Sequence, residues 1–96
     1  MLRSRNRRSG SPKKRAYFHL KAPDAREVKL CGSFNDWDTR SCPLKRDRKG
    51  VWRTSLLLEQ GTCEYRFLVD GRWQNDPDAE KTPNHFGTLN CVRVVT

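Results

Sequence analysis

Apolar runs are short throughout this 96-residue sequence, and none approaches the roughly 20 residues that a membrane-spanning helix needs. Met1 and Leu2 lead directly into arginines, without the apolar segment of a secretory signal. We therefore expect no membrane-spanning segment and a cytoplasmic location. The length allows one domain with a small core.

The sequence also lacks the spacing of a zinc site. Its four cysteines form no C-x-x-C pair, and neither histidine is a close partner of any of them. We expect no metal or other cofactor. In a reducing compartment the cysteines should be free thiols, most of them buried as small apolar groups. They are Cys31, Cys42, Cys63 and Cys91.

Acidic residues are absent from positions 1–15, which carry seven of the twenty Lys and Arg residues. The remaining thirteen basic residues face eleven acidic ones, so most of the net charge of +9 belongs to this segment. Such a composition predicts a disordered basic arm over 1–15 and one folded module over 16–96. The arm is a solvated tail, a contact for nucleic acid, acidic protein or anionic lipid, or a short transit peptide. The near-neutral module argues against a nucleic-acid surface outside the arm.

No stretch has a convincing helical period, whereas alternation with a period of two recurs along the chain. Strands are expected over 17–21, 27–32, 44–46, 51–58 and 89–95, together with a central strand and its hairpin around 70–71. Phe18, Leu20, Val28 and Leu30 should point inward, and Val92 and Val94 should share one face. Residues 33–44 and 75–87 read as polar loops. About seven short strands at this spacing predict an all-β sandwich.

The central strand carries the strongest local signal. Residues 63–69 alternate, and Asp70-Gly71 then predicts a two-residue hairpin, because both residue types tolerate positive φ. In that register Leu68 faces Trp73, so Trp73 shares a face with Arg66. The other face is the more apolar and should be the core. The hairpin therefore displays an indole beside an arginine, which suggests a binding platform.

The other two tryptophans differ in their setting. Trp52 alternates with apolar residues and should be core. Trp37 lies among turn formers, where it is either a plug folded onto the sandwich or a displayed ring. For Trp73, covering a neighbouring strand edge is the alternative to display. Flat rings beside an arginine suit a hexose, with its apolar face and hydroxyl rim, whereas nucleic-acid bases usually stack in a positively charged groove.

Several motifs together resemble the family-48 carbohydrate-binding module, the glycogen-binding domain of AMP-activated protein kinase β subunits. They are the segments 28–37 (VKLCGSFNDW), 50–52 (GVW), 64–73 (EYRFLVDGRW), 76–77 (DP) and 86–90 (FGTLN). The resemblance covers roughly residues 16–96. It implies an immunoglobulin-like β-sandwich of the early-set type that binds α-1,4-linked glucans such as glycogen, starch or maltodextrin.

The same resemblance assigns the site residues. Trp37 and Trp73 match the two tryptophans that stack on successive glucose rings, and Arg66 stands where the family has a lysine. Phe86 matches the large apolar residue that packs against the glucan. Thr88 and Asn90 complete the set, Asn90 as a hydrogen-bonding partner of sugar hydroxyls. Related modules precede the catalytic domains of branching and debranching enzymes, so a glucan-active enzyme or a kinase is an expected partner.

We expect no catalytic activity in this chain. Four loop carboxylates near the proposed site resemble a glycosidase pair only superficially and are interpreted as turn formers. They are Asp36, Asp38, Asp76 and Asp78. Two other functions remain open from the sequence: a protein-interaction scaffold built on the sandwich, and binding of nucleic acid or another anionic partner through residues 1–15.

Overall fold

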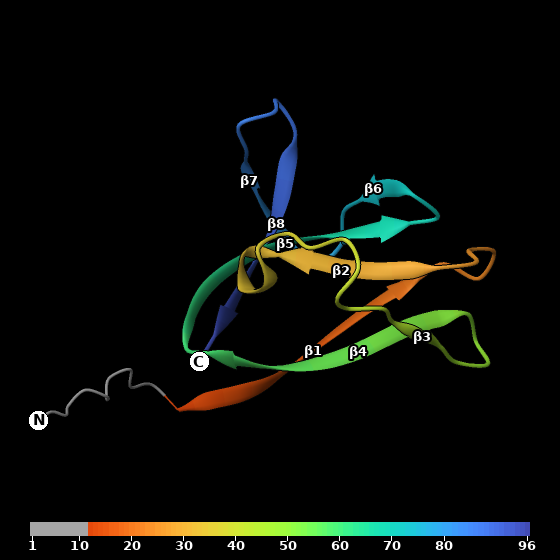
Figure 1. The fold of residues 1–96 in the computed structure, drawn as a ribbon, viewed down its shortest axis with the longest axis horizontal. Helices are drawn as coiled ribbons and strands as arrows, with labels where there is room; N and C mark the ends of the chain where they lie inside the picture. The colour runs from red at the N-terminus through yellow and green to blue at the C-terminus, as the bar shows by residue number, and fades with distance from the viewer. Residues whose placement is uncertain (1–11) are drawn as a thin grey trace, which may run out of the picture.

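The computed structural model describes residues 12–96, which form two antiparallel β-sheets packed face to face (Figure 1). This confirms the predicted all-β sandwich. Of the expected basic arm, residues 1–11 lie outside the described part. No helix within residues 12–96 has the length and apolar character needed to cross a membrane.

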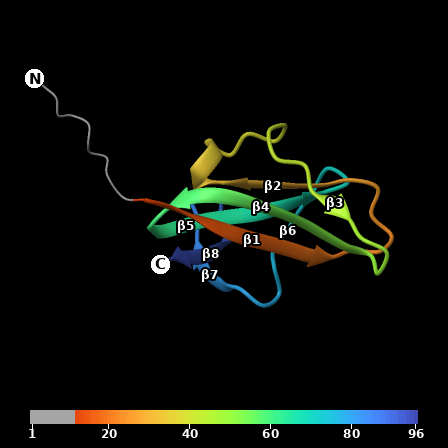
Figure 2. The same cartoon turned by 90° about the horizontal axis from the view of Figure 1, so that it is seen from below.

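The first sheet has the strand order β1–β4–β3, from β1 (Lys13–Lys21), β4 (Val51–Glu59) and β3 (Lys45–Arg46). β1 and β4 pair along their whole length, and Figure 2 shows them side by side. Alternation along β1 buries Phe18 and Leu20, as predicted. Trp52, opposite Leu20, is buried on the same inner face.

The second sheet is built around β5 (Gly61–Val69). β2 (Val28–Gly32) pairs with one edge of β5. The other edge pairs first with β8 (Leu89–Val95) and then with the short β6 (Arg72–Gln74). β7 (Glu80–Pro83) pairs with β8, and the β7–β8 connection extends away from β5 at the top of Figure 1.

The core lies between the sheets and is rich in aromatic contacts. Tyr65 packs edge-on against both Phe18 and Phe67, at centroid distances of 5.0 and 5.8 Å. Its hydroxyl donates to Asp76 at 3.1 Å, so this buried polar group is satisfied. Burial is also the main reason why the pKa of Tyr65 lies well above its usual range. Val28 and Leu30 contribute from β2, as predicted.

Two strand boundaries differ from the sequence-based expectation. β1 begins at Lys13, so the expected disorder of 1–15 does not extend over 13–15, because the backbone there pairs with 57–59 of β4. The expected loop 75–87 contains β7, so residues 12–96 form eight strands instead of about seven. Proline is tolerated in β7 because it stands at the end of an edge strand.

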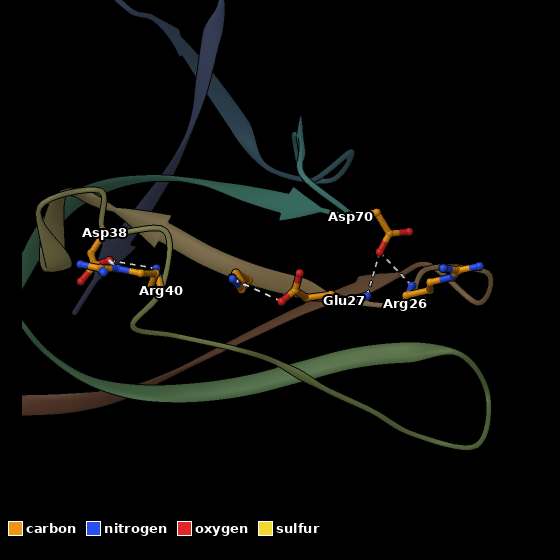
Figure 3. A network of polar contacts seen from close by, with 6 residues as sticks. Arg26, Glu27, Asp38, Arg40 and Asp70 are labelled. Atoms are coloured by element: carbon orange, nitrogen blue, oxygen red, sulfur yellow. Dashed lines mark hydrogen bonds and ion pairs between the residues drawn. The ribbon is translucent and has the colours of Figure 1, made fainter.

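The central hairpin has the predicted register. Val69 faces Arg72 and Leu68 faces Trp73, with positive φ at both Asp70 and Gly71. The Asp70 carboxylate also accepts hydrogen bonds from two backbone N–H groups of the β1–β2 connection, at 2.9 and 2.8 Å (Figure 3). This turn therefore fastens that connection, at positions 26 and 27, to the second sheet.

Candidate functional site

An open groove of about 750 Å³ lies on the outer face of the second sheet. The 3-10 turn η2 (Ser33–Asn35), β6 and the β7–β8 hairpin stand around this face in Figure 1. The groove combines aromatic rings with polar side chains. Its lining residues are Ser33, Trp37, Glu64, Arg66, Trp73, Pro83, Asn84, His85, Phe86 and Asn90.

A tight turn after β2 places Trp37 in the groove. Gly32 has no space for a side chain, since a Cβ would lie 2.5 Å from the Glu64 carbonyl oxygen and from the Phe34 ring. The Asn35 side chain accepts from the Gly32 N–H at 3.0 Å. Asp36 and Trp37 then both have positive φ, of 54° and 59°, which is strained for residues other than glycine and is typical of functional sites. The turn leaves the Trp37 ring half-buried at the groove wall.

Trp73 and Arg66 lie side by side on the outer face, as the hairpin register predicts. The guanidinium carbon of Arg66 is 5.8 Å from the centroid of the Trp73 ring, which is cation–π distance. Trp73 is 45% exposed, so much of its ring is free to contact a ligand. Two side chains hold the guanidinium: Asn75 accepts from Nε at 2.8 Å and Thr88 from Nη1 at 3.3 Å.

The β7–β8 connection forms the third wall, and Asn84 organises it. The Asn84 side-chain oxygen, Oδ1, accepts from the backbone N–H groups of Phe86 and Thr88, at 2.9 and 3.1 Å. Its amide nitrogen donates to the Asn90 side-chain oxygen at 2.9 Å. This turn holds Phe86 with 87% of its surface exposed, which is unusual for a phenylalanine unless it meets a ligand or partner.

The structure brings together five of the six residues expected at the site. Trp37, Arg66, Trp73, Phe86 and Asn90 all line the groove. The sixth residue, Thr88, bonds to one of these lining residues instead.

Sequence reasoning missed five lining residues, and only some of them carried a signal. Glu64 could have been found, because it alternates with Arg66 on β5. Ser33, Pro83, Asn84 and His85 lie at strand ends or in loops, where no period defines a face.

Two of the four loop carboxylates that the sequence analysis interpreted as turn formers hold backbone turns. Asp38 and Asp76 accept from the backbone N–H two residues further on, at 2.9 Å each, which is the expected turn-forming role.

All four cysteines are free thiols, three of them buried, as predicted. Burial is the main cause that raises the pKa of each thiol. Residues 12–96 contain no group of three or more potential metal ligands.

Comparison with known proteins gives one family match over residues 17–96, described as the "Glycogen recognition site of AMP-activated protein kinase". The chain is also similar to subunit beta-1 of 5'-AMP-activated protein kinase from Sus scrofa, with 40% identity over 67 residues. Similarity extends to subunit beta-1 from Bos taurus, at 39% over 67 residues, and subunit beta-2 from Homo sapiens, at 37% over 65 residues.

These alignments cover about 70% of the present chain but a smaller share of the relatives. They span 52% of the Sus scrofa sequence, 24% of the Bos taurus sequence and 23% of the Homo sapiens sequence. The similarity thus concerns one part of each relative.

Proposed function

The chain belongs to the family of the glycogen recognition site of AMP-activated protein kinase, and from this membership we propose that its β-sandwich binds α-1,4-linked glucans such as glycogen, starch or maltodextrin. Members of this family are carbohydrate-binding modules and not catalytic domains. The observation that carries the proposal is that Trp37 and Trp73 line one open groove together with Arg66.

The chemistry of the groove suits an uncharged sugar polymer. Each indole covers the apolar face of one glucose ring, and the Arg66 guanidinium donates to ring hydroxyls. The exposed Phe86 ring packs along the chain of the glucan. Thr88 and Asn90 supply polar contacts at the third wall.

Binding of maltoheptaose, followed by calorimetry, tests the two stacking rings separately. Trp37→Ala and Trp73→Ala should each weaken binding by about 1–3 kcal/mol through lost apolar contact. Tyr17→Ala is the matched control, because Tyr17 is an aromatic residue that is 64% exposed and lies on β1 of the first sheet, whereas the groove lies on the second sheet. Equal losses in all three variants, or none in any, would contradict stacking in this groove.

We further propose that binding serves to bring a protein partner to the polymer, either a glucan-active enzyme or a kinase. The kinase subunits named among the relatives support this role. The free thiols fit a reducing compartment, so we place the protein in the cytoplasm. Affinity capture from a cytosolic extract, with glycogen present and absent, tests whether such a partner reaches glycogen only through this chain.

A further inference from the structure

Glu64 presents a carboxylate to the groove. It lies on β5 two residues before Arg66, so both side chains point away from the core. Its Oε1 atom accepts from the Asn90 amide at 3.0 Å. Within residues 12–96 no hydrogen bond or ion pair engages the second oxygen, Oε2, so this atom is available to a ligand.

A chain of amide contacts fixes the position of this carboxylate. Asn90 is only 8% exposed, and its side-chain oxygen accepts from Asn84 while its nitrogen donates to Glu64. Each end of the Asn90 amide thus has a partner inside the protein. A carboxylate held by a buried amide keeps its orientation when the groove is empty, which lowers the entropic cost of ligand binding.

Arg66 does not neutralise Glu64 directly. The Arg66 guanidinium is held by Asn75 and Thr88, and no cation of the described residues lies within 4.0 Å of the Glu64 carboxylate. The groove therefore offers a fixed hydrogen-bond donor and a fixed acceptor of opposite charge. A sugar hydroxyl is both donor and acceptor, so a glucan can satisfy both groups.

We propose that Glu64 contacts the glucan and determines the specificity of the site, an inference that rests on the proposed function. Its carboxylate accepts hydrogen bonds from glucose hydroxyls, and the Asn90 amide nitrogen holds it in place by donating to Oε1. The negative charge offsets that of Arg66, so the groove favours uncharged glucans over glucans that carry phosphate monoesters. Without Glu64 the arginine would attract phosphate.

Two ligands measured against four proteins test this. The ligands are maltoheptaose and a maltoheptaose with phosphate monoesters on most rings, so that any binding register brings a phosphate near residue 64. The proteins are the wild type, Glu64→Gln, Glu64→Ala and the control Glu59→Gln. Glu59 is exposed at the end of β4 on the other sheet, so its substitution changes the net charge equally without touching the groove.

Both Glu64 variants should bind maltoheptaose about tenfold more weakly, as for loss of a hydrogen bond to a charged group. Both should also shift the ratio of affinities toward the phosphorylated ligand by about fivefold or more, which simple loss of structure would not do. Glu59→Gln should match the wild type. If the wild type binds maltoheptaose but a folded Glu64 variant has the same ratio of affinities as the wild type, the inference is wrong and the proposed function stands. If the wild type binds neither ligand, both the proposed function and the inference are wrong.

Discussion

Trp52 and Trp73 show how the same side chain serves two purposes in this molecule. Each indole has an arginine guanidinium carbon 5.8 Å from its ring centroid. Trp52, however, is 8% exposed and donates its ring N–H to the Ala22 carbonyl at 2.8 Å, whereas Trp73 is 45% exposed. The face of the strand decides the outcome, because Trp52 points between the sheets and Trp73 points outward.

Truncation of each ring should therefore affect stability differently. Trp52→Ala should reduce the free energy of unfolding by about 3–5 kcal/mol, because it opens a cavity in the core and leaves the Ala22 carbonyl without its donor. Trp73→Ala should leave the protein folded, with a loss below about 1 kcal/mol. Urea denaturation followed by far-UV circular dichroism measures both. A larger loss for Trp73→Ala than for Trp52→Ala would contradict the assignment of faces.

Sequence alternation predicted the position of Trp52 and Trp73 but left Trp37 undecided. In a strand, parity assigns each side chain to a face. Trp37 follows a 3-10 turn and is the second of two consecutive residues with positive φ, a backbone path that no period encodes. The same limit applies to Asn84, whose role depends on hydrogen bonds to Phe86 and Thr88 in its own loop and to Asn90 on β8.

Among the elements, the β5–β6 hairpin was predictable in register and β7 was not. Asp70-Gly71 follows a clear alternation, so local chemistry alone defines the turn. β7 has no such alternation and exists because β8 offers it a free edge, a tertiary effect that lies outside any short window of sequence. β7 nevertheless leads into the β7–β8 connection, which forms the third wall of the groove.

Gly71 provides a test of the hairpin. Its φ of +82° is costly for residues with a Cβ, although nothing lies within 4 Å of where that atom would stand. Gly71→Ala should lower the free energy of unfolding by about 1–2 kcal/mol, whereas Gly71→Asn should cost less, because asparagine tolerates this conformation. Thermal and urea unfolding of both variants give the comparison. Equal stabilities of the Ala and Asn variants would argue against backbone strain at this turn.

For the whole molecule, the cysteine thiols and the Tyr65 hydroxyl determine how the free energy of unfolding changes at alkaline pH. Burial raises the pKa of all four thiols above their ordinary value of 9.0, and that of Tyr65 above 10.0. These groups stay protonated in the folded state at a pH where the unfolded chain has already released its protons. The native state then binds more protons, so stability is fully present below about pH 9 and falls as pH rises beyond it.

Urea unfolding in the presence of reductant at several pH values between about 7 and 10.5 checks this. The midpoint should be nearly constant at first and then decrease steadily, and Cys91→Ala should flatten the decrease, because it removes one of the buried thiols. A midpoint that stays constant over the whole range would show that burial does not keep these groups protonated.

Basic residues of the described part of the chain are concentrated on one face of the molecule, which the composition alone does not show. Residues 12–96 carry sixteen basic and eleven acidic side chains, a modest excess of five. Pairing between β1, β4 and β3 places five basic residues on the outer face of the first sheet, where Glu59 is the acidic residue among the paired positions. The five are Lys13, Arg15, Lys21, Lys45 and Arg53.

Removal of residues 1–11 should therefore weaken binding to polyanions without abolishing it. The deletion takes away four arginines but leaves the basic outer face of the first sheet, so a heparin column should still retain the truncated protein and release it at a lower salt concentration. Glucan affinity should remain nearly unchanged and nearly independent of salt, because the groove lies on the opposite sheet and the proposed ligand is uncharged. Truncated protein that passes straight through heparin at low salt would assign all polyanion binding to residues 1–11, and a large loss of glucan affinity would make those residues part of the sugar site.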